Sequence, residues 1–137
     1  MRETKLTRKT DETEIEITLN LDGSGVHDIS TGVGFLDHML THIALHGLFD
    51  LHVQTSGDLH IDAHHTIEDT ALVLGQSFYQ ALGDRKGITR MGDAFVPMDE
   101  ALVHVAVDLS GRPYAVVEAE WRTPSIGQFP TSLVAHF

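Results

Sequence analysis

The side chains best suited to chemistry lie between Asp62 and Asp69, in the run Asp-Ala-His-His-Thr-Ile-Glu-Asp. On a helix, Glu68 follows His64 by four residues and His65 by three, so its carboxylate is a neighbour of both imidazoles. Adjacent helical residues point about 100° apart, so the two imidazoles face different directions. The run therefore predicts part of a metal site, in which one imidazole and Glu68 serve one ion and further ligands come from elsewhere.

The absence of cysteine restricts the chemistry of such a site. Thiolate ligands, disulfides and cysteine nucleophiles are all excluded. Imidazole combined with carboxylate suits Mn²⁺, Fe²⁺, Co²⁺, Ni²⁺ or Zn²⁺, and ligand type alone does not choose among these ions. An acidic residue near a helix N-terminus also has an ordinary structural explanation. Two adjacent histidines have none, so we favour a ligand role.

Histidine is the residue type that stands out, because the chain contains 10 of them. His38, His42 and His46 follow one another at four-residue spacing and share one face of a predicted helix. A polar outer face that happens to use imidazole is the structural alternative. Since a second histidine pair follows in the chain, we favour a ligand or substrate role for at least one of the three, and His42 is the first to discard.

Other ionisable residues are candidates for binding or proton transfer. Arg90 and Arg112 lie in predicted loops of an acidic chain, where a guanidinium can bind phosphate through two hydrogen bonds. A surface salt bridge explains either arginine equally well. Glu12 and Glu100 each precede a similar strand and could be acid–base groups or plain strand-edge charges. The position of His136 in the sequence does not by itself indicate any function.

Composition excludes several function classes. The chain has 137 residues, as expected for one domain, and a formal net charge of −11, which is the wrong sign for binding nucleic acid. No apolar run is long enough to span a membrane, and no leader is evident, so we expect a cytoplasmic protein. Phosphate-binding loops, dinucleotide-binding turns and nucleophile elbows are missing, so NAD chemistry and serine hydrolysis have no support.

The hydrophobic pattern predicts a mixed α and β chain. Alternation predicts strands, and apolar residues at three- and four-residue spacing predict helices. The predicted helices cover residues 35–46 and 66–82. The predicted strands cover residues 14–21, 26–30, 48–54, 58–62, 103–109 and 114–121.

An internal repeat organises these elements. Residues 11–23 align without gaps on residues 99–111, an offset of 88, with the Asp-Glu pair, one Leu and the Gly identical. Chance similarity of two acidic-led strands is the alternative. We predict a first half at 1–86, carrying the metal-binding helices, and a second half at 87–137 that ends before its closing helix.

Three motifs resemble the imidazoleglycerol-phosphate dehydratase family: residues 31–40, 57–70 and 98–114. The resemblance covers residues 8–137. It implies an α+β fold, a duplicated two-layer sandwich in which each half is a four-stranded sheet backed by two helices, with the second half truncated. It also implies a large homo-oligomer (a 24-mer in the family) with active sites at subunit interfaces and no membrane or nucleic-acid partner.

The same resemblance implies two Mn²⁺ per active site and a role for particular residues. The implied metal ligands are His38, His64, His65, Glu68 and His136. The implied substrate-binding residues are Glu12, His38, His46, His64, Glu68, Arg90 and Arg112, with the arginines toward phosphate; the catalytic groups among them are Glu12, Glu68 and His64. His42 falls where the family is not restricted to histidine. Ala63 replaces a frequent aspartate beside the ligands.

The implied reaction removes water from imidazole glycerol phosphate, a phosphorylated imidazole, to give imidazole acetol phosphate in L-histidine biosynthesis. The proton to be removed is on a carbon with no adjacent carbonyl, and metal ions bound to both ring nitrogens would make the imidazolate an electron source. Glu12 is the candidate acid–base group, with help from Glu68 or a metal-bound water.

One departure from the family pattern concerns the other ligands. The family carries a second His-His-x-x-Glu motif on the closing helix of its second half, and this sequence ends before it. Our hypothesis is a fragment or shortened form that binds Mn²⁺ weakly and turns over little. One alternative is an inactive homologue that acts as a metal-binding or assembly module. Another is a divalent-metal hydrolase, which the internal repeat and the two arginines argue against.

Overall fold

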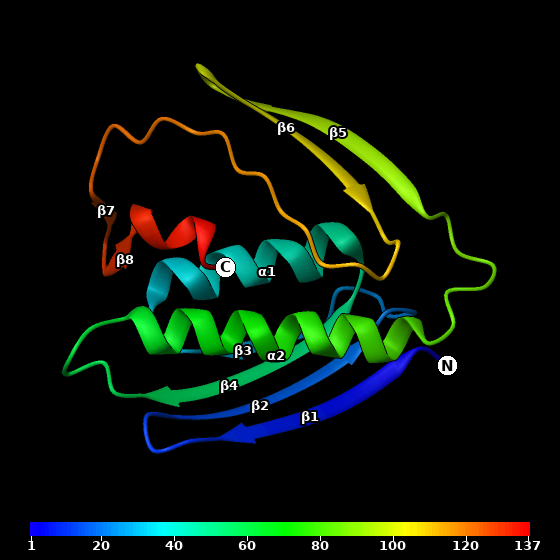
Figure 1. Cartoon of the computed structure of the whole chain (residues 1–137), viewed down its shortest axis with the longest axis horizontal. Helices are drawn as coiled ribbons and strands as arrows, with labels where there is room; N and C mark the ends of the chain where they lie inside the picture. The colour runs from blue at the N-terminus through cyan, green and yellow to red at the C-terminus, as the bar shows by residue number, and fades with distance from the viewer. The chain divides into compact units, whose positions relative to one another are not determined.

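A four-stranded sheet covered on one face by two helices forms the first of two units in the computed structural model, which describes all 137 residues (Figure 1). This unit contains residues 1–82 and 117–137. The strand order is β1-β2-β4-β3, antiparallel except that β3 runs parallel to β4. The strands are β1 (Glu3–Lys9), β2 (Thr13–Asn20), β3 (His27–Ser30) and β4 (Asp50–Gly57), and the helices are α1 (Gly34–Gly47) and α2 (His64–Leu82).

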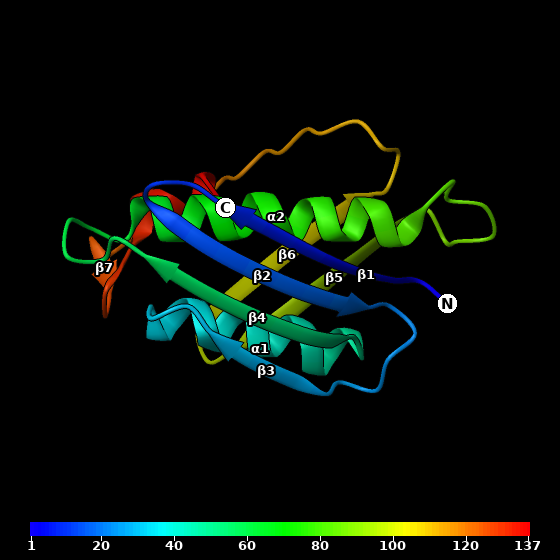
Figure 2. The ribbon, with the colours of Figure 1, turned by 90° about the horizontal axis from the view of Figure 1, so that it is seen from below.

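The core lies between this sheet and its two helices, which Figure 2 shows behind the strands. Ile15, Ile17 and Leu19 alternate along β2 and are almost completely buried, while the residues between them are not. Leu36, Leu40 and Ala44 form the buried face of α1, and Ile67 and Leu74 belong to the buried face of α2. Sheet and helices therefore bury the periodic apolar residues that predicted them.

Both helices begin at the same end of the sheet, because each follows one of the two parallel strands, β3 and β4. Aspartates organise both helix starts. Asp37 accepts hydrogen bonds from the Thr31 backbone N–H (2.8 Å) and hydroxyl (2.6 Å). Asp62 accepts one from the His64 N–H (2.7 Å). The Asp62 carboxylate thereby caps a free N–H at the start of α2, whereas Asp37 fixes the loop before α1, whose own start has no side-chain cap.

The C-terminal residues of this unit pack beside the starts of the helices. They form the short strands β7 (Ser125–Ile126) and β8 (Phe129–Pro130) and the 3₁₀ helix η1 (Thr131–Ala135). Phe129 and Leu133 are buried, and the Phe129 ring meets the Phe35 ring edge to face with centroids 5.6 Å apart. Contacts of η1 with α2 hold this segment against the helix that carries the histidine pair.

The second unit, residues 83–116, is built on a hairpin of β5 (Met91–Met98) and β6 (Ala101–Asp108). Its register repeats that of β1 and β2 at the predicted offset: Glu3 pairs with Asn20, and Met91 pairs with Asp108. The closing hydrogen bonds are also equivalent, from Leu21 N–H to the Arg2 carbonyl and from Leu109 N–H to the Arg90 carbonyl, both 2.9 Å. The internal repeat is therefore present as two hairpins of the same register.

The structure confirms the α+β class and the helix-backed four-stranded sheet of the first half, and it corrects the predictions of several strands and of the helix starts. Residues 58–62 form a turn instead of a strand, because the Asp58 carbonyl accepts the Ile61 N–H (2.8 Å). Residues 114–121 alternate in hydrophobicity but pair with no strand. Strands β1 and β5 were not predicted, and Leu6 is the one apolar residue of β1. The helices begin at Gly34 and His64, slightly earlier than predicted. The division of the chain into halves at residue 86 stays a prediction.

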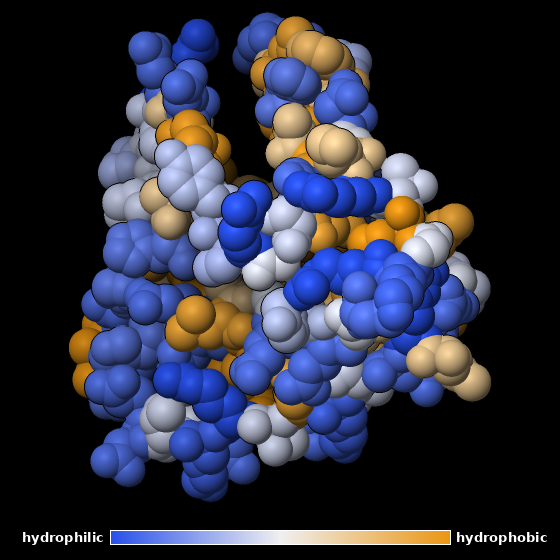
Figure 3. Space-filling view, turned by 45° about the vertical axis from the view of Figure 1, so that its right-hand side comes forward, coloured by the Kyte–Doolittle hydropathy of each residue, from blue (hydrophilic) through white to orange (hydrophobic).

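The surface is mixed in character. Figure 3 shows hydrophobic areas separated by polar side chains on the face that it presents. In the β5–β6 hairpin, large apolar side chains such as Phe95, Met98 and Leu102 are more than half exposed. No helix is both long and apolar enough to cross a membrane.

Candidate active site

The structure brings together three potential ligand atoms, from His64, Glu68 and His136, all within 4.8 Å of one another. His64 Nε2 lies 2.8 Å from Glu68 Oε2, and His136 Nδ1 lies 3.5 Å from the same oxygen. The two imidazole rings are 5.0 Å apart at 82°. Each of the three side chains is more than two-fifths exposed, so a solute can reach the group.

His136 reaches this group because of packing rather than periodicity. Burial of Phe129 and Leu133 fixes the segment on the first unit. The N–H groups of His136 and Phe137 then donate to the Leu133 carbonyl, at 3.0 and 3.2 Å. Apolar burial of two side chains therefore positions an imidazole that no local pattern marked.

His65 has a separate set of carboxylate neighbours. Its ring centroid is 5.9 Å from that of His64. Nδ1 of His65 lies 2.9 Å from Asp58 Oδ2, and Nε2 lies 3.7 Å from Glu12 Oε2. The adjacent imidazoles therefore face different carboxylates, His64 toward Glu68 and His65 toward Asp58 and Glu12, as their helical spacing predicted.

Glu12 is held beside His65 by the turn between β1 and β2. The Thr10 hydroxyl accepts the N–H groups of Glu12 (3.2 Å) and Thr13 (3.0 Å). Thr13 is paired with Gly57 at the end of β4, so the turn lies next to the loop that carries Asp58. The antiparallel register thus brings Glu12 to the start of α2.

Hydrogen bonds favour the charged forms of Glu68, in the first group, and of His65 and Asp58, in the second. The hydrogen bond from His64, followed by that from His136, keeps the pKa of Glu68 below its usual value, although partial burial opposes the shift. The hydrogen bond to Asp58 raises the pKa of His65, and the negative charge of Glu12 adds to the effect. The same contact lowers the pKa of Asp58. Glu68 is therefore an ionised carboxylate near neutral pH.

The group of His64, Glu68 and His136 fits a divalent ion of the transition series. Imidazole nitrogen and carboxylate oxygen are the ligands that Mn²⁺ and its neighbours accept. The three atoms already lie within 4.8 Å, and small side-chain rotations would bring them to one ion. Because metal ligands must be unprotonated, binding would displace any proton shared between His64 and Glu68.

The three histidines of α1 form a row on its exposed face. His42 lies 3.1 Å from His38, measured between Nε2 atoms, and its Nδ1 lies 3.2 Å from His46 Nε2. His42, the member that we discarded as a ligand, therefore links the other two. His38 is in the second turn of α1, at the end of the sheet where α2 begins, whereas His46 lies about 12 Å further along the axis. Neither joins the group around Glu68.

The two candidate phosphate-binding arginines belong to the second unit. Arg90 donates to both oxygens of Asp108, at 2.6 and 2.9 Å, and this contact raises the pKa of Arg90. The backbone N–H of Arg112 donates to the Ser110 hydroxyl (3.3 Å). Arg90 thus already binds a carboxylate in the manner that would suit phosphate.

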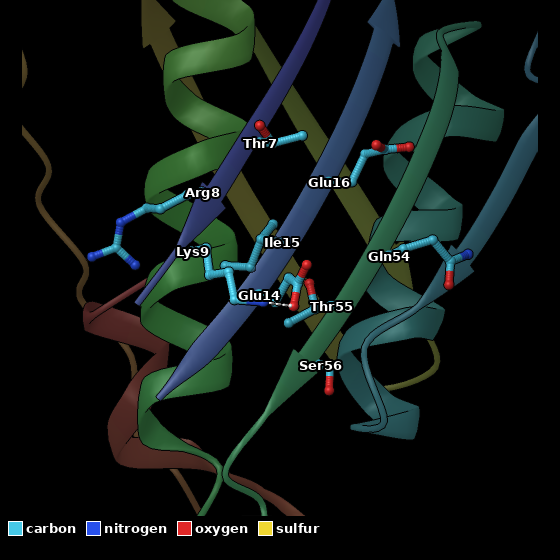
Figure 4. A pocket seen from close by; sticks show the side chains of 9 residues that line it. All are labelled: Thr7, Arg8, Lys9, Glu14, Ile15, Glu16, Gln54, Thr55 and Ser56. Atoms are coloured by element: carbon cyan, nitrogen blue, oxygen red, sulfur yellow. Dashed lines mark hydrogen bonds and ion pairs between the residues drawn. The ribbon is translucent and has the colours of Figure 1, made fainter. Parts of the chain in front are cut away.

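A shallow depression of about 520 Å³ lies on the sheet itself, over β1, β2 and β4 (Figure 4). Most of the residues that line it are polar, and two of them, Lys9 and Glu14, form an ion pair with Nζ 2.6 Å from Oε2. None of the predicted site residues lines this depression.

Sequence reasoning assigned no role to Asp58 or Thr10, which hold His65 and the Glu12 turn. A signal for Asp58 was available, because it lies directly after Gly57, the last residue of β4, and seven residues before His65. A loop that joins a strand to a helix often carries functional side chains.

Comparison with known proteins assigns the chain to a family. The family described as "Imidazoleglycerol-phosphate dehydratase" matches residues 31–137. The chain belongs to this family. The imidazoleglycerol-phosphate dehydratase of Roseiflexus sp. (strain RS-1) is 61% identical over 135 residues, which are 98% of this chain and 68% of that protein. That of Acetivibrio thermocellus is 59% identical over 136 residues, 99% of this chain and 70% of that protein.

Solved structures of imidazoleglycerol-phosphate dehydratases share the fold. The crystal structure of the Staphylococcus aureus enzyme superposes with a TM-score of 0.85 at 36% identity, covering 98% of this chain and 73% of that chain. The Pyrococcus furiosus enzyme, in complex with (S)-C348, gives a TM-score of 0.76 at 35% identity, covering 96% of this chain and 69% of that chain. Dehydratases of this kind are hydro-lyases, so the chain is assigned to that class of enzyme.

Proposed function

We propose that the chain takes part in the dehydration of imidazole glycerol phosphate to imidazole acetol phosphate, a step of L-histidine biosynthesis, at a site with two Mn²⁺ ions. The observation that carries the proposal is the convergence of His136, near the end of the given sequence, on the pair His64 and Glu68 of α2. Membership of the dehydratase family supports the choice of reaction.

The imidazoles and carboxylates at the start of α2 are the proposed metal ligands. His64, Glu68 and His136 form one set, and His65 belongs to a second, with His38 as a further ligand. Mn²⁺ bound there would act as a Lewis acid toward the imidazole ring of the substrate. His64 and Glu68 would thereby also orient the ring.

Loss of water needs one proton taken from a carbon and one given to the departing hydroxyl. Glu12 is the proposed group for these proton transfers. Its Oε2 lies 3.7 Å from His65 Nε2, and its side chain is more than half exposed. Glu68 is too strongly held by His64 and His136 to be the first choice of base. Its proposed part is to hold the cation and the ring.

The phosphate of the substrate would be bound by Arg90 and Arg112. Arg90 would exchange the Asp108 carboxylate for phosphate, since a guanidinium binds both in the same bidentate manner. His46 is the proposed further substrate contact. Active sites completed at subunit interfaces of a large homo-oligomer form part of the proposal.

The test is dehydration of imidazole glycerol phosphate with added Mn²⁺, measured on this chain and on a chain extended past Phe137. Turnover that disappears in a Glu68→Gln variant supports the proposal. Metal binding without turnover in both chains would instead favour a metal-binding or assembly module. No Mn²⁺ binding and no turnover in either chain would overturn the assignment.

A further inference from the structure

The side chain of Asp58 has features that fold stability alone does not explain. Its exposed fraction is 11%, its Oδ2 lies 2.9 Å from His65 Nδ1, and its Oδ1 is buried without a hydrogen-bond partner. A buried carboxylate oxygen that lacks a partner costs free energy. An unpaired buried oxygen of this kind needs an explanation beyond packing, and the contact of the other oxygen with His65 offers one.

The backbone around Asp58 leaves the carboxylate little freedom to move. A Cβ built on Gly57 would lie 2.1 Å from the Thr66 hydroxyl, so the end of β4 touches the first turn of α2. The Asp58 carbonyl also accepts the Ile61 N–H (2.8 Å), which closes the turn after the strand. Strand and helix together hold the carboxylate against the Nδ1 edge of the His65 ring.

A neutral imidazole carries its proton on one nitrogen and a lone pair on the other, and only the lone pair binds a metal. We propose that Asp58 is a positioning residue that holds the proton of His65 on Nδ1 and so presents the Nε2 lone pair beside Glu12 as a cation ligand. The ligand part rests on the proposed function. The tautomer part does not.

The adjacent histidine provides an internal contrast. His64 meets Glu68 through Nε2, and Asp62 binds the backbone N–H of His64 instead of its ring. His65 alone of the pair has a nearly buried carboxylate on Nδ1 and an open Nε2. Carboxylates that orient a metal-binding histidine in this way typically contribute about 10- to 100-fold to metal affinity.

The tautomer of His65 can be measured in the metal-free chain by ¹⁵N NMR, at a pH high enough for neutral imidazoles. A His65→Gln variant identifies the His65 signal among those of the other histidines. We expect Nδ1–H in the unaltered chain, and a shift toward Nε2–H in Asp58→Asn. Asp62→Asn is the matched control, because Asn also accepts the His64 N–H, and it should keep the Nδ1–H form.

Mn²⁺ titration followed by proton relaxation gives the second readout. We expect Asp58→Asn to weaken binding by about 10- to 100-fold, and Asp62→Asn to leave it within about twofold. An Nε2–H tautomer in the unaltered chain would overturn the proposal, and that result does not depend on whether any variant folds. The predicted tautomer combined with no Mn²⁺ binding would overturn the proposed function and leave the positioning role intact.

Discussion

His136 Nδ1 lies 3.5 Å from Glu68 Oε2, although one residue is next to the end of the chain and the other is in the second turn of α2. The contact exists because the C-terminal segment buries Phe129 and Leu133 on the first unit. The ligand geometry of the site is therefore tied to apolar packing outside it.

Leu133→Ala should loosen this segment. We expect a loss of about 2–3 kcal/mol in the free energy of unfolding, because the side chain is buried and its removal leaves a cavity. Mn²⁺ affinity should fall as well, since His136 would leave Glu68. Urea unfolding and Mn²⁺ titration check the two effects, and Ile126→Ala, at a more exposed position, is the control. Unchanged Mn²⁺ affinity in a destabilised variant would remove His136 from the proposed ligands.

Glu68→Gln should remove the negative charge of the carboxylate that His64 and His136 both contact. We expect Mn²⁺ affinity to fall by more than about 10-fold, since a directly bound ligand contributes at least as much as its supporting partners. The fold should persist, because the side chain is more than two-fifths exposed. Circular dichroism monitors the fold, and Glu14→Gln, on the sheet depression, is the matched control. Equal Mn²⁺ affinities of the two variants would contradict the site.

Gly57→Ala should press the end of β4 against α2. Its new methyl group would lie 2.1 Å from the Thr66 hydroxyl, and we expect a loss of about 1–3 kcal/mol. Thr66→Ala alone should cost less than an ordinary core truncation, because that buried hydroxyl has no hydrogen-bond partner. The double variant should recover part of the loss. Purely additive effects in thermal unfolding would show that the two positions do not touch.

Acid stability should depend on Asp50. Its carboxylate accepts the N–H groups of Ser24 (2.8 Å) and Val26 (3.0 Å), which lowers its pKa in the folded chain. The unfolded chain therefore binds this proton first, so the stabilisation is present above the ordinary aspartate pKa of about 3.9 and is lost as pH falls through the lowered value. Asp50→Asn should flatten that part of the profile. Parallel curves of unfolding free energy between about pH 6 and pH 2 would contradict it.

The sequence predicted the elements whose apolar residues repeat. Ile15, Ile17 and Leu19 marked β2, and the spacing of Leu36, Leu40 and Ala44 marked α1. The pattern failed for β1, which adds Leu6 alone to the core, and its pairing with β2 is a matter of backbone hydrogen bonds.

The site was predictable only where its members are close in sequence. His64 and Glu68 meet because of helical spacing, and the structure has them 2.8 Å apart. Glu12 and His136 reach the same region through strand register and C-terminal packing, which no local pattern encodes. His136 was named from resemblance alone, and Glu12 was a candidate from its place before a repeated strand, with a strand-edge charge as the alternative. Asp58 was overlooked because its segment was predicted as a strand, where its carboxylate would have had no fixed partner.

The exposed β5–β6 hairpin has a consequence for hydrogen exchange. Every residue from Met91 to Met98, and from Ala101 to Val107, is exposed, so little buried apolar surface opposes its opening. Its amide protons should exchange through local opening, whereas those of Ile15 and Ile17 in β2 should require unfolding of the whole first unit. One melting temperature would then describe only part of this chain, and exchange measured residue by residue would separate the two halves of the repeat by their free energies of opening.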